Sequence, residues 1–122
     1  CLMFKRKRAT VIVETEKGIL LVSHLIFGRF LFALPGGGIK KNENPEDAAR
    51  REVKEETGLK LKDVKYLFDY STLFHEHKVF SAKGFGELKK SWETRHFAFY
   101  GDDVEVGKSF RKMIETYLNN HQ

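Results

Sequence analysis

Residues 37–59 of the chain read GGIKKNENPEDAARREVKEETGL, a glycine-rich loop followed by a segment in which three glutamates, Glu52, Glu55 and Glu56, fall within five residues. If this segment is helical, Glu52 and Glu56 are i,i+4 neighbours, and Glu55 lies three residues from Glu52. Such like charges repel by about a few tenths of a kcal/mol per pair on an isolated helix, and a bound divalent cation removes that cost. Carboxylate oxygens without Cys or His ligands suit hard cations such as Mg2+, Mn2+ or Ca2+.

Local sequence signals predict a helix from residue 45 to residue 57. Asn44 is a favourable N-cap residue, and Pro45 takes the first helical position, where its missing N–H costs nothing. Acidic residues in the first turn lie at the positive end of the helix dipole. Gly58 then provides a stop, because glycine readily adopts the left-handed conformation that ends helices.

The acidic cluster also has a plainer interpretation, because charged residues on a helix usually form a solvated face. Arg51 precedes Glu55 by four residues, so it can orient or neutralise that carboxylate. A glycine-rich loop, a capped helix, an internal arginine and a terminal glycine together favour a metal site over a solvated face.

The same residues follow a longer pattern, Gly-x5-Glu-x7-Arg-Glu-U-x-Glu-Glu-x-Gly-U, in which U is bulky and aliphatic. The chain matches every fixed position: Gly37, Glu43, Arg51, Glu52, Val53, Glu55, Glu56, Gly58 and Leu59. The stretch 37–59 thus resembles the Nudix box, and the segments 9–22 and 34–38 resemble the hairpin and loop that precede it in that family. The resemblance implies an α/β fold, a Nudix-type α/β/α sandwich with a mixed β-sheet.

The resemblance also implies which residues hold the metal. Glu52, Glu55 and Glu56 form the expected metal-binding set, and the backbone carbonyl of Gly36, just ahead of the box, is expected to join them. The expected cofactor is Mg2+, for which Mn2+ can substitute.

Catalytic roles beyond the metal set follow from the same resemblance. Arg51 is expected to orient the site rather than to act as a base, and Glu43 to support the loop or the outer shell of the metal. Family members often use a further carboxylate before a late strand, a place that Glu93 occupies and for which Glu87 competes. The base differs between branches of the family, so Glu55 and Glu93 are both candidates.

Apolar periodicity predicts mixed helices and strands around the box. We expect strands over residues 10–15, 19–24, 30–34, 64–74, 78–83 and 95–100, with breaks at Gly84 and Gly86, and a second helix over residues 109–119. A mixed sheet with helices on both faces buries all of these apolar faces.

Composition limits the class of protein. At 122 residues, the chain is expected to form one domain over residues 1–122. No apolar run approaches the length of a membrane span and no secretory signal is visible, so no membrane partner is expected. One cysteine cannot form an internal disulfide, which favours the cytoplasm. A monomer and a homodimer both stay open.

The net charge of +5 suits polyanions, which include nucleotides. The densest basic cluster covers residues 5–8, and its plain interpretation is a solvated segment. Its alternative is phosphate contact, for which we keep Arg8 as a candidate substrate-binding residue. Trp92 is a second candidate, as a base-stacking side chain. No nucleic-acid-binding motif accompanies the cluster, which argues against a nucleic-acid partner.

Two histidines, His75 and His77, would share one face of a strand. Side chains at this spacing can bind a metal, but we favour a solvated face.

The resemblance implies hydrolysis of a nucleoside diphosphate linked to another group X. A compact chain resembles the small MutT-like branch, which acts on nucleoside triphosphates, sometimes oxidised ones, to give a monophosphate and pyrophosphate. Branches acting on ADP-ribose or on dinucleoside polyphosphates often carry a proline or a tyrosine where this chain reads LFHE at residues 73–76. The absence of both residues favours a triphosphate substrate. The expected partner is a nucleotide-type small molecule.

Three alternatives stay open at this point. The substrate can be ADP-ribose or another NDP-X compound, or the triphosphorylated 5′ end of an RNA, for which the basic N-terminal segment is the only hint. The chain can also be a non-catalytic nucleotide-binding module, although such modules commonly lose the box carboxylates that this chain keeps.

Overall fold

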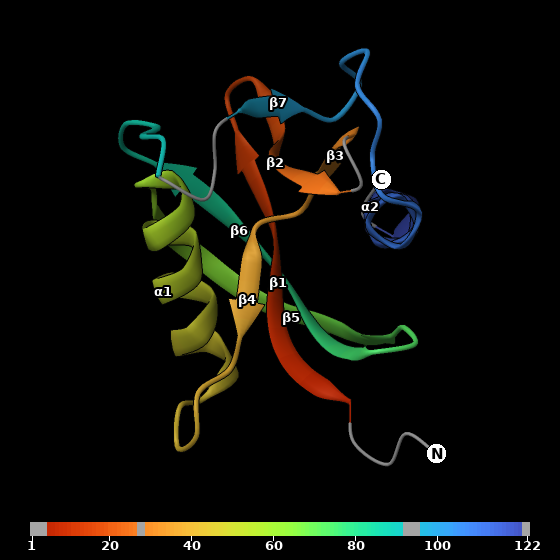
Figure 1. The fold of residues 1–122 in the computed structure, drawn as a ribbon. Coiled ribbons are helices and arrows are strands. Elements are labelled where there is room, and N and C mark those ends of the chain that lie inside the picture. Colours follow the sequence, from red (N-terminus) through yellow and green to blue (C-terminus); the bar gives the residue numbers. More distant parts are fainter. Residues whose placement is uncertain (1–4, 27–28, 92–95, 121–122) are drawn as a thin grey trace.

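The computed structural model describes residues 5–26, 29–91 and 96–120 (Figure 1). In chain order, the elements are β1 (Arg6–Thr15), β2 (Gly18–Ile26), β3 (Arg29–Ala33), β4 (Gly36–Gly38), α1 (Pro45–Thr57), β5 (Lys60–Ser71), β6 (His75–Phe85), β7 (Phe97–Phe99) and α2 (Lys108–Asn120). The sheet is mixed, because β1 and β6 are parallel while the other strand pairs are antiparallel.

Strand β1 is the centre of the sheet. The strand order is β3-β2-β1-β6-β5, with β4 paired to β1 and β7 paired to β2. In the first half of β1, Ala9 lies opposite Gly37 of β4 on one side and Lys78 of β6 on the other. Residues in this half of β1 are therefore close both to the glycines of the box and to the start of β6.

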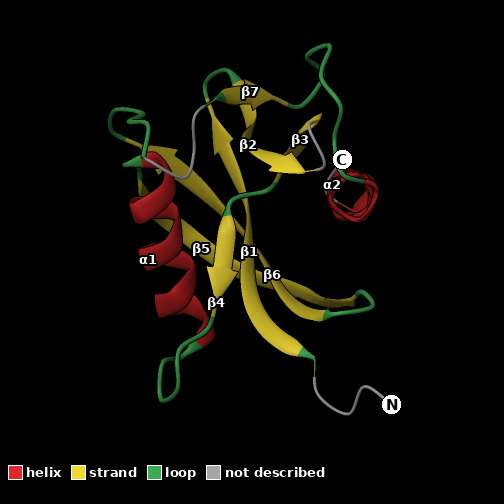
Figure 2. Cartoon of the chain, viewed as in Figure 1, coloured by secondary structure: helices red, strands yellow, loops and turns green. Residues whose placement is uncertain are grey.

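Successive side chains of β1 enter two different apolar cores. Val11 and Val13 belong to the core under α1, whereas Ile12 belongs to the core under α2, and all three are fully buried. Each such side chain contributes about 1.5–3 kcal/mol relative to exposure in water. Helices α1 and α2 lie on opposite sides of the sheet (Figure 2). The predicted α/β/α sandwich with a mixed sheet is thus confirmed.

Helix α1 begins and ends where the sequence predicts. The side chain of Asn44 accepts a hydrogen bond from the backbone N–H of Asp47 over 2.8 Å, and Pro45 follows in the first turn. At the other end, Gly58 adopts a left-handed conformation with φ +79° and donates its N–H to the carbonyl of Lys54 over 2.9 Å. The cap and the stop fix the orientation of the glutamates along the helix.

Near the box, β4 and β5 differ from the sequence prediction. Gly36–Gly38 form the short strand β4 rather than a plain loop, because they pair with residues 8–10 of β1. The strand expected over residues 64–74 starts at Lys60 and ends at Ser71 instead. It ends there because Thr72 donates its N–H to the carbonyl of His75 over 2.9 Å and closes a tight connection to β6.

Strand β6 also runs further than predicted. It continues through Gly84, an expected break, because Gly84 pairs with Leu61 of β5. The late strand β7 covers only Phe97–Phe99, which pair with residues 20–22 of β2. Helix α2 extends the predicted helix by one residue at each end.

In the described part of the chain, neither α1 nor α2 is both long and apolar enough to cross a lipid bilayer.

Candidate active site

The glycines of β4 lie directly against the side chains of two box glutamates, Glu52 and Glu56. Gly36 has φ +152°, and a Cβ atom there would lie 2.1 Å from the carbonyl oxygen of Ala9. At Gly37, a Cβ atom would lie 2.3 Å from the carboxylate carbon of Glu52. Both values are below any normal contact, so these two positions require glycine for different reasons. The first lets β4 approach β1, and the second leaves room for Glu52.

Glu52 and Glu56 both face β4 from adjacent turns of α1. The Oε1 atom of Glu56 accepts the backbone N–H of Gly36 over 2.7 Å. The carboxylate of Glu52 lies against Gly37, and its side chain is 18% exposed. The i,i+4 spacing of a helix brings these two carboxylates to one side, and the glycines of β4 hold them there.

Arg51 links the loop before α1 to the helix itself. Its Nε and Nη2 atoms donate to the two carboxylate oxygens of Glu43 over 2.8 and 3.0 Å, and Nη2 also donates to the carbonyl of Gly38 over 3.0 Å. Its Nη1 atom donates to Glu52 and to Glu55 over 3.2 Å each. One guanidinium thus fixes Glu43 of the loop, Gly38 of β4 and two glutamates of α1.

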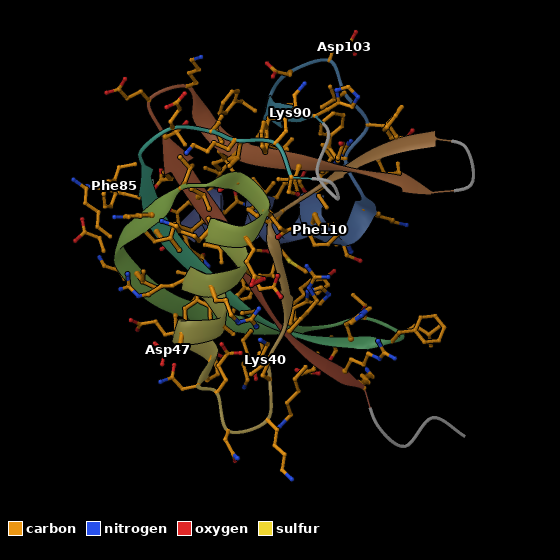
Figure 3. All side chains as sticks on the ribbon, turned by 60° about the vertical axis from the view of Figure 1, so that its left-hand side comes forward. Lys40, Asp47, Phe85, Lys90, Asp103 and Phe110 are labelled. Atoms are coloured by element: carbon orange, nitrogen blue, oxygen red, sulfur yellow. The ribbon has the colours of Figure 1, made fainter. Side chains whose placement is uncertain are left out.

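This arrangement changes the ionisation of Glu43. The hydrogen bonds from Arg51, followed by the backbone N–H of Lys40, lower the pKa of Glu43 from 4.5 to about 2. In return, the hydrogen bonds to Glu43 raise the pKa of Arg51. Lys40 lies in the loop at the same end of α1 as Asp47, as Figure 3 shows. Glu43 is therefore ionised at neutral pH and anchors Arg51.

Glu55 lies on the outer side of the cluster. Its side chain is 56% exposed and contacts Nη1 of Arg51, whereas Glu52 and Glu56 face β4. Among residues 5–26, 29–91 and 96–120, no three Asp, Glu, His or Cys side chains are close enough to hold a metal ion as they stand. The structure therefore brings the predicted residues into one neighbourhood, with the positive charge of Arg51 between Glu52 and Glu55.

Arg8 faces the same carboxylates from β1. It lies opposite Gly38 of β4, and its Nε donates to the hydroxyl of Thr10 over 3.2 Å. Burial lowers the pKa of Arg8, and attraction to Glu56 and then to Glu52 partly offsets that effect. A half-buried cation thus lies within the electrostatic reach of Glu56 and Glu52.

Three predicted site residues follow β6 in the chain, namely Glu87, Trp92 and Glu93. Glu93 and Trp92 lie outside the residues that the structure describes. Glu87 is exposed, in a segment attached to the end of α1, where Lys89 donates its N–H to the carbonyl of Thr57 over 2.8 Å. Glu87 thus lies two residues from a backbone hydrogen bond to the box helix.

Sequence reasoning missed a polar contact beneath Arg8. His77 is only 3% exposed, and its Nδ1 lies 2.8 Å from the hydroxyl of Thr10, which is fully buried. The interpretation of His77 as part of a solvated face is wrong, because β6 lies inside the sheet and the ring of Phe110 from α2 covers this face, 5.8 Å from the ring of His77. The available sequence signal was the spacing of His75 and His77, which places both side chains on one face of a strand.

Two cavities lined by described residues lie away from the glutamates. One, of about 570 Å³, is lined by the turn between β1 and β2 and by the segment that follows β6. The other, of about 460 Å³, adjoins the first turn of α1 and the side chains of Tyr66 and Phe80. Neither has Glu52, Glu55 or Glu56 in its lining.

Sequence comparisons agree with this geometry. A family model described as the NUDIX domain matches residues 4–111. A curated relative from Bacillus subtilis (strain 168), named as a candidate 8-oxo-dGTP diphosphatase, is 41% identical over 59 residues, which cover 48% of this chain and 37% of the relative. An RNA pyrophosphohydrolase from Bartonella henselae is 42% identical over 80 residues, which cover 60% of this chain and 43% of the relative. The chain thus spans less than half the length of these two relatives.

A structural comparison extends over nearly the whole chain. The crystal structure of a protein from Chromobacterium violaceum, described as a nudix hydrolase family member, matches with a TM-score of 0.85 at 30% sequence identity. The match covers 98% of this chain and 80% of the other chain.

Proposed function

Because the chain belongs to the Nudix family, we propose that it hydrolyses the diphosphate linkage of a nucleotide-type substrate with the help of a divalent cation. The preferred substrate is a nucleoside triphosphate, oxidised forms included, and the products are a nucleoside monophosphate and pyrophosphate. We further propose that residues 1–122 act as one domain and that the reaction takes place in the cytoplasm, as the single cysteine suggests.

The observation that carries this proposal is the contact of Glu52 and Glu56 with the glycines of β4. Two carboxylates on one side of α1, one bound to the N–H of Gly36 and the other lying against Gly37, hold oxygen atoms at a fixed edge of the sheet. A solvated acidic face would need no glycine beneath it and no such backbone contact.

The donor chemistry fits a hard cation. Glu52 and Glu56 offer carboxylate oxygens, and Glu55 reaches the same neighbourhood through Arg51. The carbonyl oxygen of Gly36 is a further candidate, because this residue lies beside Glu56. Oxygen-only sets of this kind favour Mg2+ or Mn2+ over softer ions. When bound, such an ion neutralises phosphate oxygens and lowers the pKa of a bound water.

The side chains of this chain supply the remaining parts. Arg51, anchored by Glu43, keeps Glu52 and Glu55 in place. Glu55 is the more solvent-exposed carboxylate, which suits a base that takes a proton from water, and Glu93 remains the other candidate for that role. Arg8 is proposed to bind a phosphate of the substrate, since a planar guanidinium suits phosphate oxygens.

A second candidate function is removal of pyrophosphate from the 5′ end of an RNA. Two features favour it. A relative with that name is 42% identical over 80 residues, and a row of basic and imidazole side chains leads away from the box carboxylates. In that row, Arg6 and Arg8 of β1 pair with His75 and His77 of β6. Burial, followed by the charges of Arg8 and Arg6, lowers the pKa of His75. A polyanion longer than a mononucleotide fits such a row.

The test is product release from a substrate panel. The protein is incubated with nucleoside triphosphates, 8-oxo-dGTP, ADP-ribose and a short 5′-triphosphorylated RNA, each with Mg2+, with Mn2+ and after exhaustive chelation. We expect pyrophosphate release that disappears on chelation and returns with Mg2+ or Mn2+. Turnover that survives chelation contradicts the metal assignment. No turnover on any substrate, despite nucleotide binding, favours the non-catalytic alternative.

A further inference from the structure

Three polar side chains form a hydrogen-bonded chain on the face of the sheet that α2 covers. The Nε of Arg8 donates to the hydroxyl oxygen of Thr10 over 3.2 Å, and that hydroxyl lies 2.8 Å from Nδ1 of His77. Arg8 and His77 are direct partners across the parallel pair β1 and β6. The contact is therefore built from two neighbouring strands in the middle of the sheet rather than from mobile loops.

The direction of each hydrogen bond follows from the donors available. Nε of arginine carries a hydrogen and cannot accept, so the oxygen of Thr10 accepts from Arg8. The hydroxyl hydrogen of Thr10 is then free to be donated to Nδ1 of His77 when this nitrogen carries a lone pair. This direction of the hydrogen bond requires a neutral His77 with its proton on Nε2. Burial, the charge of Arg8 and the proximity of His75 lower the pKa of His77 to about 4, which agrees with a neutral ring.

The guanidinium of Arg8 also has an aromatic neighbour, Phe110. Its carbon lies 5.9 Å from the ring centroid of Phe110 on α2, which is labelled in Figure 3. The ring of His77 meets the same phenylalanine edge-on, at 5.8 Å and 88°. Thr10 and Phe110 together restrict the rotamers of a long side chain that otherwise has many. Glu56 and Glu52 attract the charge that is held in this way.

We propose that Thr10 and His77 are positioning residues that hold the Arg8 guanidinium toward the box carboxylates, where it binds a phosphate of the substrate. This inference rests on the proposed function and adds to it the two residues that prepare the phosphate-binding arginine. Preorganisation is the physical advantage: an arginine already fixed in place loses less conformational freedom when substrate binds.

The kinetic test compares Thr10→Val with Thr10→Ser. Valine keeps the shape but removes the hydroxyl, whereas serine keeps the hydroxyl. Because Arg8 is expected to contact the phosphate in the bound substrate and in the transition state alike, its loss of position should raise KM rather than lower kcat. We expect KM to rise on the order of 10-fold in Thr10→Val, and Thr10→Ser to stay near the parent, since a charged hydrogen bond is lost only in the former.

A double-mutant cycle separates positioning from general stability. If Thr10 acts through Arg8, Thr10→Val should change KM very little in an Arg8→Ala background. Ser81→Ala is the matched control: Ser81 is a buried hydroxyl on the same face of β6, and its partner is Tyr117 rather than Arg8. This control should leave KM unchanged even where it lowers the melting temperature. If Thr10→Val and Arg8→Ala raise KM independently, so that their effects multiply in the double variant, the inference is contradicted.

Two measurements do not need turnover. Nitrogen-15 NMR of the parent protein at pH 7 should report a neutral His77 with its proton on Nε2, and a proton on Nδ1 overturns the inference without any variant. Calorimetry with a non-hydrolysable nucleoside triphosphate should show weaker binding by Thr10→Val, again on the order of 10-fold. Absence of turnover by the parent contradicts the proposed function, whereas equal KM and equal analogue affinity in Thr10→Val contradict this inference.

Discussion

Gly36 donates its backbone N–H to the carboxylate of Glu56 over 2.7 Å, although one residue lies in strand β4 and the other in the last turn of helix α1. The bond joins the glycine-rich segment to the helix across the loop that separates them in sequence. It gives Glu56 a fixed position at the edge of the sheet, which a carboxylate on an isolated helix lacks.

Glu56→Gln should leave the fold intact and lower turnover by orders of magnitude. The amide oxygen of glutamine can still accept the N–H of Gly36, but the charge that attracts a divalent cation is lost. The measurement is kcat at saturating substrate and Mg2+, alongside the melting temperature. Glu115→Gln, an exposed position on α2, is the control that should change neither quantity. Near-parental kcat in Glu56→Gln would remove this residue from the metal set.

Gly37→Ala and Gly38→Ala form a matched pair in neighbouring positions of β4. A methyl group at Gly37 would lie 2.3 Å from the carboxylate carbon of Glu52, whereas one at Gly38 meets nothing within 4 Å. Glu52 therefore has to move in the first variant only, and displaced catalytic groups commonly cost on the order of 10²-fold in rate. We expect a large loss of turnover in Gly37→Ala and a near-parental rate in Gly38→Ala. Equal rates in the two variants would show that the position of Glu52 does not matter.

Acid titration should reveal the pair formed by Arg51 and Glu43. The pKa of Glu43 is lowered from 4.5 to about 2 in the folded protein, so this carboxylate stabilises the fold above pH 4.5. That contribution should be lost as the pH falls from 4.5 toward 2. In Arg51→Met, the pKa of Glu43 should return toward its ordinary value, and the pH dependence of the unfolding free energy should be correspondingly smaller.

The measurements for this pair are an NMR titration of the Glu43 carboxyl group and urea unfolding at several pH values. Arg50→Met is the matched control, since Arg50 pairs with Glu46 and does not touch Glu43. An unchanged pKa of Glu43 in Arg51→Met, or an equal shift in both variants, contradicts the assignment.

Glu93→Gln should lower turnover strongly, and Glu87→Gln should have a small effect. Neutralising a carboxylate that acts as base or metal ligand typically lowers turnover on the order of 10²-fold or more. Neutralising a surface carboxylate hardly changes turnover. Glu87 is exposed, in a segment held at the end of α1. Both variants are assayed at the same pH and Mg2+ concentration. The reverse ranking moves the role to Glu87, and two small effects limit the catalytic carboxylates to the box.

Local sequence was sufficient for the box helix. Its start at Pro45, the cap at Asn44 and the stop at Gly58 agree with the prediction, because capping bonds and glycine conformation depend on residues within one helical turn. The sandwich was also predictable, since the apolar periodicity of the strands and of the second helix requires cover on both faces of a sheet. The same signals put Glu52 and Glu56 on one side of a helix, as their spacing dictates.

The tertiary structure alone decided what these glutamates face. The pairing of β4 with β1 brings Gly36 to Glu56 and Gly37 to Glu52, and the parallel pairing of β1 with β6 places His77 beside Arg8. Neither pairing leaves a local signal, because strand register is set by contacts between segments that are distant in the chain. Burial of His77, and with it the neutral ring that can accept a hydrogen bond from Thr10, exists only once α2 has packed against that face of the sheet.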